Sequence, residues 1–167
     1  MVTRAAQLGR EAGAKVILDP APPVGLPDEL FQLLDVIRPN ASEAERLTGV
    51  KVKDRGSART AAERLLQRGV GAVAVQAGDE GNLLVWANGE SWLPKLPVKS
   101  VDATGAGDAF AGALAVAMAE SRPLAEAGAF ANAAAALATT ALGTQAGLPR
   151  REAVLALLAS LSAEKNP

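Results

Sequence analysis

The chain contains neither cysteine nor histidine. Without a thiol, disulfides and thiolate metal sites are excluded within these residues. Without an imidazole, Ser-His-Asp triads, histidine general bases and the commonest zinc ligand are excluded as well. Any acid–base chemistry in this sequence therefore depends on Asp, Glu or Lys.

The chain also lacks an excess of charge of either sign, because its 17 Lys and Arg residues nearly balance its 18 Asp and Glu residues. No basic field favours nucleic acid or an anionic membrane surface. The only long apolar run, residues 123–142, is mostly alanine and includes Glu126 and Asn132, so it does not predict a membrane span. The charged N-terminus does not resemble a leader peptide. We expect a soluble, cytoplasmic protein that binds neither nucleic acid nor membrane.

What the chain does contain suits one globular domain, because 49% of its 167 residues are hydrophobic. Short apolar runs at 15–20, 35–40 and 71–78 predict strands, and residues 81–98 predict a hairpin around Asn88-Gly89. Between and after them, helical patterns cover residues 3–13, 27–34, 41–49, 57–70, 106–119, 123–141 and 149–161, the last with Pro149 in its first turn. This alternation predicts an α/β fold with a mostly parallel sheet layered by helices. The chain opens on a helix rather than a strand, as if it began in the middle of a fold.

The stretch VDATGAGDAF, residues 101–110, predicts an anion pocket. Glycines let backbone amides converge at a helix start, where the helix dipole is positive. Asp108 would then stand beside a bound phosphate and could take a proton from an attacking hydroxyl. For this pattern alone, an ordinary loop with Asp108 as the helix N-cap is equally good. A dinucleotide fingerprint needs a small residue where Phe110 stands, and a Walker A loop needs Gly-Lys-Ser/Thr, which is absent.

The string DATGAGDAFAGA, residues 102–113, resembles the second signature of the ribokinase-like (PfkB) carbohydrate kinases. Four further segments follow that family in order, with the separations of the ribokinases: ILDPAP (17–22), RPNASEAERLTG (38–49), VQAGDEG (75–81) and ANAAAALATTALGTQAGLP (131–149). The resemblance implies a ribokinase-like three-layer α/β/α sandwich. It also implies ATP-dependent phosphorylation of a sugar hydroxyl, with Mg²⁺ and a monovalent cation such as K⁺.

The same resemblance assigns the chemistry of the glycine loop. Asp108 would be the catalytic base that deprotonates the sugar hydroxyl. The amides of Gly105, Ala106 and Gly107 would form the anion hole for the γ-phosphate, and Gly107 would also contact the nucleotide.

Asn40 and Glu43 match the family's Asn-x-x-Glu motif, which implies that Asn40 contacts the nucleotide and that Glu43 acts indirectly on Mg²⁺. The same two residues also form the pattern of a capping box. By themselves they favour the cap, and both roles can coexist through bridging water.

Two further elements are implied to contact the nucleotide. One is the loop of Gln76, Ala77, Gly78, Asp79, Glu80 and Gly81, although Gln76 stands where the family often has a hydroxyl. Without the family resemblance, the residues of this loop predict a tight strand-to-strand turn. The other is Asn132, implied to lie near the adenine; by its residue type alone it would be a solvent-facing Asn.

A monovalent cation site is implied by oxygen ligands around the loop of residues 138–147. The set consists of Asp102, Thr104, Ala138, Ala141, Gly143 and Gly147. Gly147 stands where ribokinases often have Ser, so one side-chain oxygen is missing. As the competing interpretation, Asp102 is an ordinary loop carboxylate.

Members of this family are about twice as long, and the match is to their C-terminal half. We therefore expect residues 1–167 to be the nucleotide-binding portion, without the lid and sugar site of the N-terminal half, and to phosphorylate sugars poorly alone. Two alternatives stay open. One is another family kinase that acts on nucleosides or phosphosugars, and the other is a non-catalytic nucleotide-binding fragment that associates with itself, for example as a homodimer.

Overall fold

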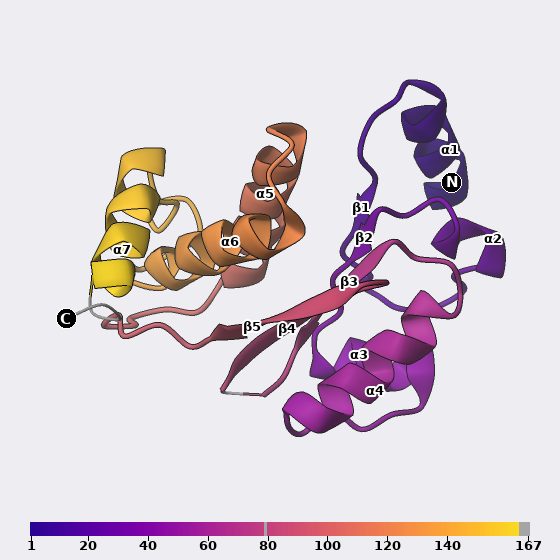
Figure 1. Cartoon of the computed structure of the whole chain (residues 1–167), viewed down its shortest axis with the longest axis horizontal. Helices are drawn as coiled ribbons and strands as arrows, with labels where there is room; N and C mark the ends of the chain where they lie inside the picture. Colours follow the sequence, from indigo (N-terminus) through magenta and orange to yellow (C-terminus); the bar gives the residue numbers. More distant parts are fainter. Residues whose placement is uncertain (79, 164–167) are drawn as a thin grey trace. The chain divides into compact units, whose positions relative to one another are not determined.

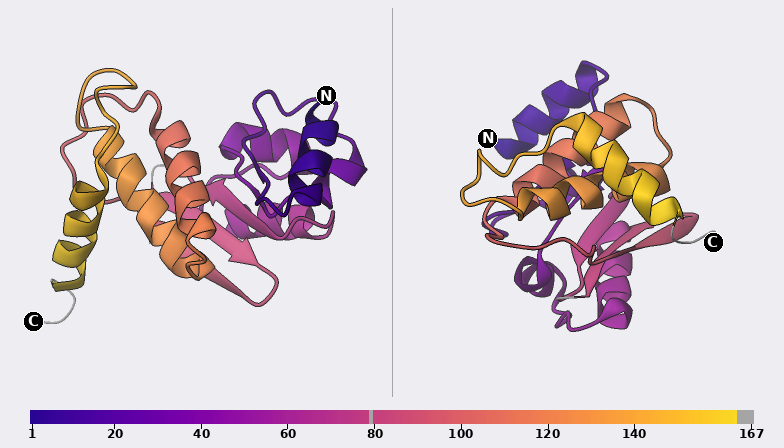
Figure 2. Two further views of the ribbon diagram at one scale, coloured as in Figure 1. Left: turned by 90° about the horizontal axis from the view of Figure 1, so that it is seen from above. Right: turned by 90° about the vertical axis from the view of Figure 1, so that its left-hand side faces the viewer.

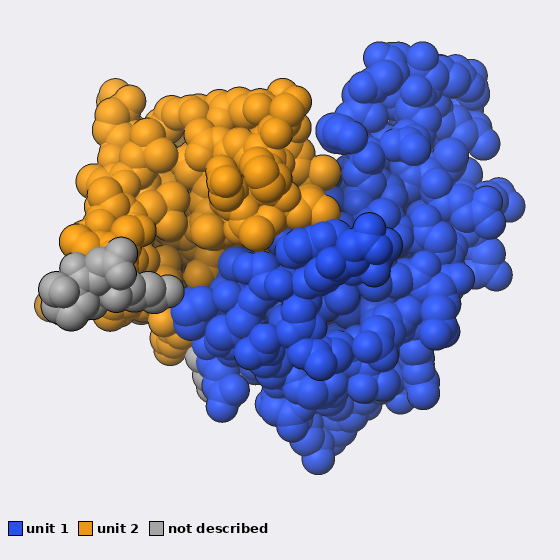
Figure 3. All heavy atoms as spheres, viewed as in Figure 1, with its two compact units in different colours: residues 1–94 blue, residues 95–167 orange. Residues whose placement is uncertain are grey.

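The computed structural model describes residues 1–78 and 80–163, which form seven helices and five strands (Figure 1). The chain divides into two compact units, Met1–Pro94 and Lys95–Pro167 (Figure 3). In the part of the chain that the structure describes, no helix combines the length and the apolar character needed to cross a membrane.

The first unit is built on one five-stranded sheet in the order β1-β2-β3-β4-β5. Its strands are β1 Ile17–Leu18, β2 Val36–Ile37, β3 Ala72–Gln76, β4 Gly81–Trp86 and β5 Gly89–Pro94. The first three strands pair in parallel, and β3, β4 and β5 pair antiparallel. The α/β class is confirmed, but the sheet is mixed rather than mostly parallel, because the short loops on either side of β4 only permit antiparallel neighbours.

The hairpin predicted for residues 81–98 is confirmed, with a small shift of its turn. Trp86 pairs with Gly89, so the two loop residues are Ala87 and Asn88. Gly89 is the first residue of β5 rather than part of the turn. A β-carbon at this position would lie 2.9 Å from the Trp86 ring, which explains why a glycine is suited to it.

Four helices accompany this sheet: α1 Val2–Glu11, α2 Asp28–Phe31, α3 Ala41–Thr48 and α4 Arg55–Leu66. They confirm the predicted helices, although α2 is shorter than 27–34 and α4 ends at Leu66 rather than at 70. The α4 helix begins before residue 57 because Asp54 and Ser57 form a capping box that the sequence analysis missed. Val73, Val75, Leu83 and Val85 point from the strands into a core that includes Leu65 of α4.

The alternate strand residues point to the second face of the sheet, because side chains in a strand alternate between faces. The side chains on this second face are apolar and almost completely buried; they are Val36, Ala72, Ala74 and Leu84. Both faces of the central strands are thus apolar, as expected for strands that are covered on both sides.

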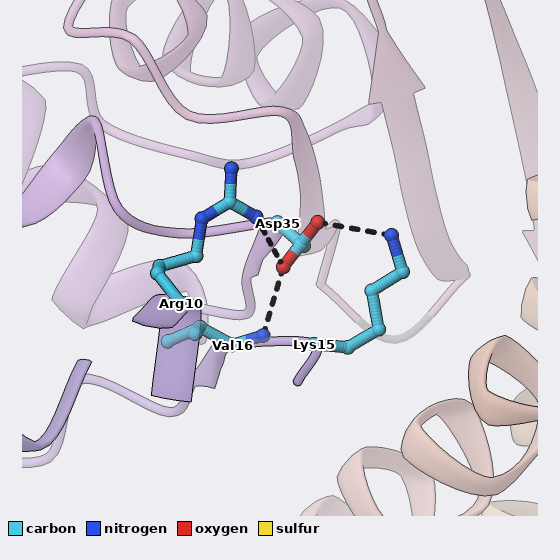
Figure 4. A network of polar contacts seen from close by, with 4 residues as sticks. All are labelled: Arg10, Lys15, Val16 and Asp35. Carbon is cyan, nitrogen blue, oxygen red and sulfur yellow. Dashed lines mark hydrogen bonds and ion pairs between the residues drawn. The ribbon is translucent and has the colours of Figure 1, made fainter. Parts of the chain in front are cut away.

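Asp35 ties α1 and β1 to the start of β2 (Figure 4). Its carboxylate accepts hydrogen bonds from the amide of Val16 at 2.8 Å, from Arg10 at 3.1 Å and from Lys15 at 3.3 Å. Burial raises the pKa of Asp35, but the Val16 hydrogen bond and the bonds and charges of Lys15 and Arg10 outweigh it and lower the pKa below its ordinary value.

The second unit contains α5 Ala106–Ala119, α6 Leu124–Ala138 and α7 Arg151–Ala163. Helices α5 and α6 lie side by side, with α7 next to α6 (Figure 2). The small residues of α5 and α6 let their backbones approach around the larger buried side chains Phe110, Leu114 and Phe130.

Two predicted helix boundaries in this unit were wrong. Helix α6 ends at Ala138 rather than at 141. Directly after Ala138, the hydroxyls of Thr139 and Thr140 donate to carbonyls of the last helical turn. Helix α7 begins at Arg151, so Pro149 precedes the helix instead of lying in its first turn. Glu120, the C-cap of α5, forms salt bridges with Arg122 in the following loop and with Arg151, and the second of these joins the end of α5 to the start of α7.

Candidate functional site: a glycine loop at a helix start

The glycine loop leads directly into α5, as predicted. Gly105 is the N-cap, with φ of +81°, a left-handed conformation that favours glycine. Asp108 is exposed in the first turn of the helix. The interpretation of Asp108 as the N-cap is therefore wrong, because the helix begins three residues earlier along the loop.

The backbone amides at this helix start fall into two groups. The amide of Ala106 donates to the Ala103 carbonyl at 3.2 Å, and that of Ala109 donates to Gly105 at 2.9 Å. Within the described chain the amides of Gly105, Gly107 and Asp108 make no hydrogen bond. Two of the three predicted anion-hole amides are thus available, whereas Ala106 is engaged in the loop.

The amide of Asp108 is a further available donor that the sequence analysis missed. The signal for it was present, since the first amides of any helix have no partner within the helix. A phosphoryl group held here would face amides and a carboxylate from the same turn.

A second loop, residues 139–147, packs against the glycine loop. Asp102 Oδ1 accepts from the hydroxyl of Thr104 at 2.6 Å and from its amide at 2.9 Å, and Oδ2 accepts from the amide of Gly143 at 3.0 Å. Thr144 lies over Gly105, so a β-carbon there would be 3.0 Å from its methyl group. The hydrogen bonds of Thr104 and Gly143 lower the pKa of Asp102. Asp102 is therefore a structural loop carboxylate, whatever else it binds.

The structure brings most, but not all, of the residues predicted for the cation site into contact with one another. Asp102, Thr104 and Gly143 share the hydrogen bonds just described. The carbonyl oxygens of Ala138 and Gly143 converge on Gly147, where a β-carbon would overlap the Ala138 oxygen. Ala141 lies in the same loop but makes no hydrogen bond to these residues in the described chain.

In the first unit, Asn40 and Glu43 form the capping box of α3. Asn40 Oδ1 accepts from the amide of Glu43, and Glu43 Oε2 accepts from the amide of Asn40, both at 2.9 Å. The Glu43 side chain is buried. The capping role is confirmed, and one carboxylate oxygen of Glu43 remains outside the box.

The loop after β3 is the tight strand-to-strand turn that its residues predicted. The amide of Ala77 donates to the Gly81 carbonyl at 2.9 Å, which closes the turn. The amide of Gln76 donates to Pro39 at 3.3 Å, so the loop starts beside the residue before Asn40. Gln76 and Glu80 are exposed, Ala77 is buried, and the predicted contact of Asp79 lies outside the described residues.

Asn132 is buried in α6, with 8% of its surface exposed. The interpretation of Asn132 as a solvent-facing residue is therefore wrong. The predicted site residues thus occur in two sets. Asn40, Glu43 and the 76–81 loop belong to the first unit; the glycine loop, the 139–147 loop and Asn132 belong to the second.

A mixed sheet, whose parallel strands are continued by a hairpin and alternate with helices along the chain, places the chain in the α/β class. The chain belongs to the pfkB family of carbohydrate kinases, whose sequence profile matches residues 1–151. This finding confirms the family resemblance and the ribokinase-like fold class.

Ribokinases are among the relatives most similar to this chain. A ribokinase of Haemophilus influenzae is 41% identical over 158 residues, which cover 94% of this chain and 51% of that protein. The crystal structure of ribokinase from Thermotoga maritima matches with a TM-score of 0.81 and 42% identity over 93% of this chain and 52% of that one. The Arabidopsis thaliana ribokinase complexed with ribose and ATP matches with a TM-score of 0.84 and 35% identity over 94% of this chain and 51% of that one.

Two further structures carry ligands that bear on the proposed cofactors. A structure from E. coli in complex with ATP and Mg²⁺ has a TM-score of 0.76 at 26% identity, over 95% of this chain and 53% of that one. Phosphofructokinase-2 from E. coli in complex with potassium has a TM-score of 0.80 at 26% identity, over 96% of this chain and 52% of that one. The chain spans about half the length of the curated relatives it matches.

Proposed function

We propose that residues 1–167 are the nucleotide-binding portion of an ATP-dependent sugar kinase of the ribokinase type. The observation that carries this proposal is the start of α5, where the amides of Gly105, Gly107 and Asp108 make no hydrogen bond within the described residues and accompany the exposed Asp108 carboxylate. Membership of the pfkB family and the similarity to a ribokinase complexed with ribose and ATP support it.

In the proposed reaction, Asp108 accepts the proton of the sugar hydroxyl as that oxygen attacks the γ-phosphorus of ATP. The bond from the γ-phosphorus to the bridging oxygen breaks, and ADP leaves. The amides of Gly107, Gly105 and Asp108 would donate hydrogen bonds to the oxygens of the transferred group, where negative charge is held through the transition state.

Asn40, Gln76, Gly78, Glu80 and Gly81 are proposed to line the nucleotide, with Asn132 near the adenine. Their placement at the carboxyl ends of β2 and β3 supports this for the first unit, because ligands of open α/β sheets bind at that edge.

The residues present fit the two implied metal ions. Glu43 offers a carboxylate oxygen outside the capping box, which suits an indirect, water-mediated contact with Mg²⁺. The carbonyls around Gly147 form a cradle of oxygens that a β-carbon would fill, which suits K⁺ beside Asp102. When bound, the ions would supply positive charge near the phosphates.

We propose the cytoplasm as the location of the protein, because ATP is present there. That the protein forms a homodimer stays a prediction.

Calorimetry of the 167-residue chain with ATP and Mg²⁺ tests the nucleotide site, and a coupled assay on ribose and other sugars tests turnover. We expect ATP binding with little or no turnover by the chain alone. In a full-length protein that contains this sequence, Asp108→Asn should lower kcat by about 10²- to 10⁴-fold with ATP affinity little changed. Equal rates in that pair would remove Asp108 from the mechanism, and a chain that binds no ATP would contradict the proposal.

A further inference from the structure

Two charged side chains, which are not among the predicted site residues, lie together at the carboxyl edge of the sheet. Ile17 pairs with Val36 and Leu18 with Ile37, so Asp19 and Arg38 are neighbours one residue beyond these strands. The alternation of side chains places both on the second face, the face of Val36. That face is apolar along the strands, and Asp19 and Arg38 add charge where the strands end.

Asp19 and Arg38 form a partly buried ion pair. Arg38 Nη1 donates to Asp19 Oδ2 at 3.0 Å, and 13% of the Arg38 side chain and 34% of the Asp19 side chain are exposed. The amide of Arg38 also donates to the Leu18 carbonyl at 2.9 Å, so the backbones of β1 and β2 are joined without the ion pair. Removing a guanidinium from water is unfavourable, and an apolar pair could join two strands as well. A role beyond joining the strands is therefore indicated.

The position of Arg38 suggests what that role is. Arg38 lies two residues before Asn40, and the intervening Pro39 carbonyl accepts from the amide of Gln76. The guanidinium thus comes from the same sheet edge as the capping box and the start of the 76–81 loop. This is the edge at which open α/β sheets bind their ligands.

We propose that Arg38, oriented by Asp19, binds the phosphate chain of the nucleotide. The inference rests on the proposed function and extends it to a residue that is not among the predicted site residues. A guanidinium presents a planar fork of donors that matches phosphate oxygens, and it stays charged at any physiological pH. Asp19 is a positioning residue, because its carboxylate restricts the direction of the fork before the nucleotide arrives.

Calorimetry of the 167-residue chain with ATP and with AMP, both in the presence of Mg²⁺, tests the proposal. Arg38→Met should weaken ATP binding about 10- to 100-fold, the range for a lost hydrogen bond to a charged group, and AMP binding less than about threefold. Asp19→Asn keeps the side-chain shape but not its charge, and should lower the ATP-to-AMP affinity ratio by about 3- to 10-fold. Arg38→Lys, which keeps a charge but not the fork, should lie between wild type and Arg38→Met.

The matched control is Arg68→Met, which removes an arginine paired with the exposed Asp28 at 2.6 Å in the same unit. This variant should leave the ATP-to-AMP ratio unchanged. If Arg38 only joins the strands, its variants will lower the unfolding midpoint and leave the ratio as in wild type, which overturns the proposal. Should Arg38→Met fail to fold, the ratio in Asp19→Asn and Arg38→Lys decides in the same way. A wild-type chain that binds neither nucleotide overturns the proposed function together with this inference, whereas wild-type binding with unchanged ratios overturns this inference alone.

Discussion

Asp102 binds the amide of Gly143, 41 residues further along the chain, through its Oδ2 atom at 3.0 Å. Its other oxygen binds Thr104 in its own loop. One carboxylate thereby joins the glycine loop at the start of α5 to the loop that follows α6. The shape of the proposed phosphate pocket depends on a residue that need not touch the phosphate.

Replacing Asp102 by Ala should release both loops. We expect the amides of Thr104 and Gly143 to exchange with solvent at least about tenfold faster. In the variant these amides have lost their hydrogen bonds to Asp102, so exchange no longer requires an opening that breaks those bonds. Hydrogen exchange followed by NMR measures this. Asp54→Ala, which removes the cap of α4, is the control and should accelerate Ser57 but not Gly143. Unchanged exchange at Gly143 in Asp102→Ala would contradict the proposed connection.

Gly147→Ala should destabilise the chain by about 1–3 kcal/mol, since the added β-carbon would overlap the Ala138 carbonyl oxygen and force the backbone apart. Urea denaturation measures the change. Gly112→Ala is the opposite case, because nothing lies within 4 Å of its β-carbon position in α5. There we expect up to about 1 kcal/mol of stabilisation from helix propensity. Equal effects of the two substitutions would disagree with the observed packing.

Glu43→Gln separates the two roles of the capping box. The carboxamide oxygen can still accept from the amide of Asn40, so the free energy of unfolding should change by less than about 0.5 kcal/mol. If Glu43 orients water on Mg²⁺, the gain in ATP affinity that Mg²⁺ provides should fall about 10-fold or more. Titrations with ATP, with and without Mg²⁺, measure that gain.

The control for this substitution is Asn40→Ala, which removes the cap and should lower stability by about 1 kcal/mol. Full retention of the Mg²⁺-dependent gain in Glu43→Gln would leave Glu43 with the capping role alone.

The Asp35 network should make stability depend on pH. The pKa of folded Asp35 lies below its ordinary value, so the unfolded state takes up the proton first as the pH falls. The stabilisation is complete above the ordinary carboxyl pKa and is lost as the pH falls through the folded pKa. At pH 7, Asp35→Asn should be less stable than wild type by about 1–2 kcal/mol, a difference that shrinks below about pH 4.

Urea denaturation between pH 3 and 7 measures this difference. Glu11→Gln serves as the control, because the ion pair of Glu11 with Arg4 is exposed on both sides and should contribute less than about 0.5 kcal/mol. A difference between wild type and Asp35→Asn that is the same at pH 3 and pH 7 would rule out the carboxylate as its cause.

Local patterns predicted most of the helices and strands. The bounds of α5 came out as expected, 106–119, because glycines mark its start and a long apolar run follows without interruption. The capping box of Asn40 and Glu43 was equally predictable, since both partners lie within one turn. The end of α6 was not, because alanines continue the helical pattern past Ala138 and only the two threonine hydroxyls and the following loop end the helix.

Contacts between distant residues had no local signal. The sequence presented Asp102 either as a cation ligand or as a loop carboxylate, and only the fold revealed its bond to Gly143. Asn132 looked like a surface residue from its type, yet its burial depends on which face of α6 packs inward, and alanine on every side of the helix conceals that face.

By itself, the sequence determined the family, the α/β alternation and the glycine loop that opens α5, because these depend on residue types at short, fixed spacings. Only the tertiary structure decided which amides at that helix start stay free, which loop Asp102 holds, and that Asp19 meets Arg38. These outcomes depend on strand register and on loops that meet across many residues, and a one-dimensional pattern does not contain that geometry.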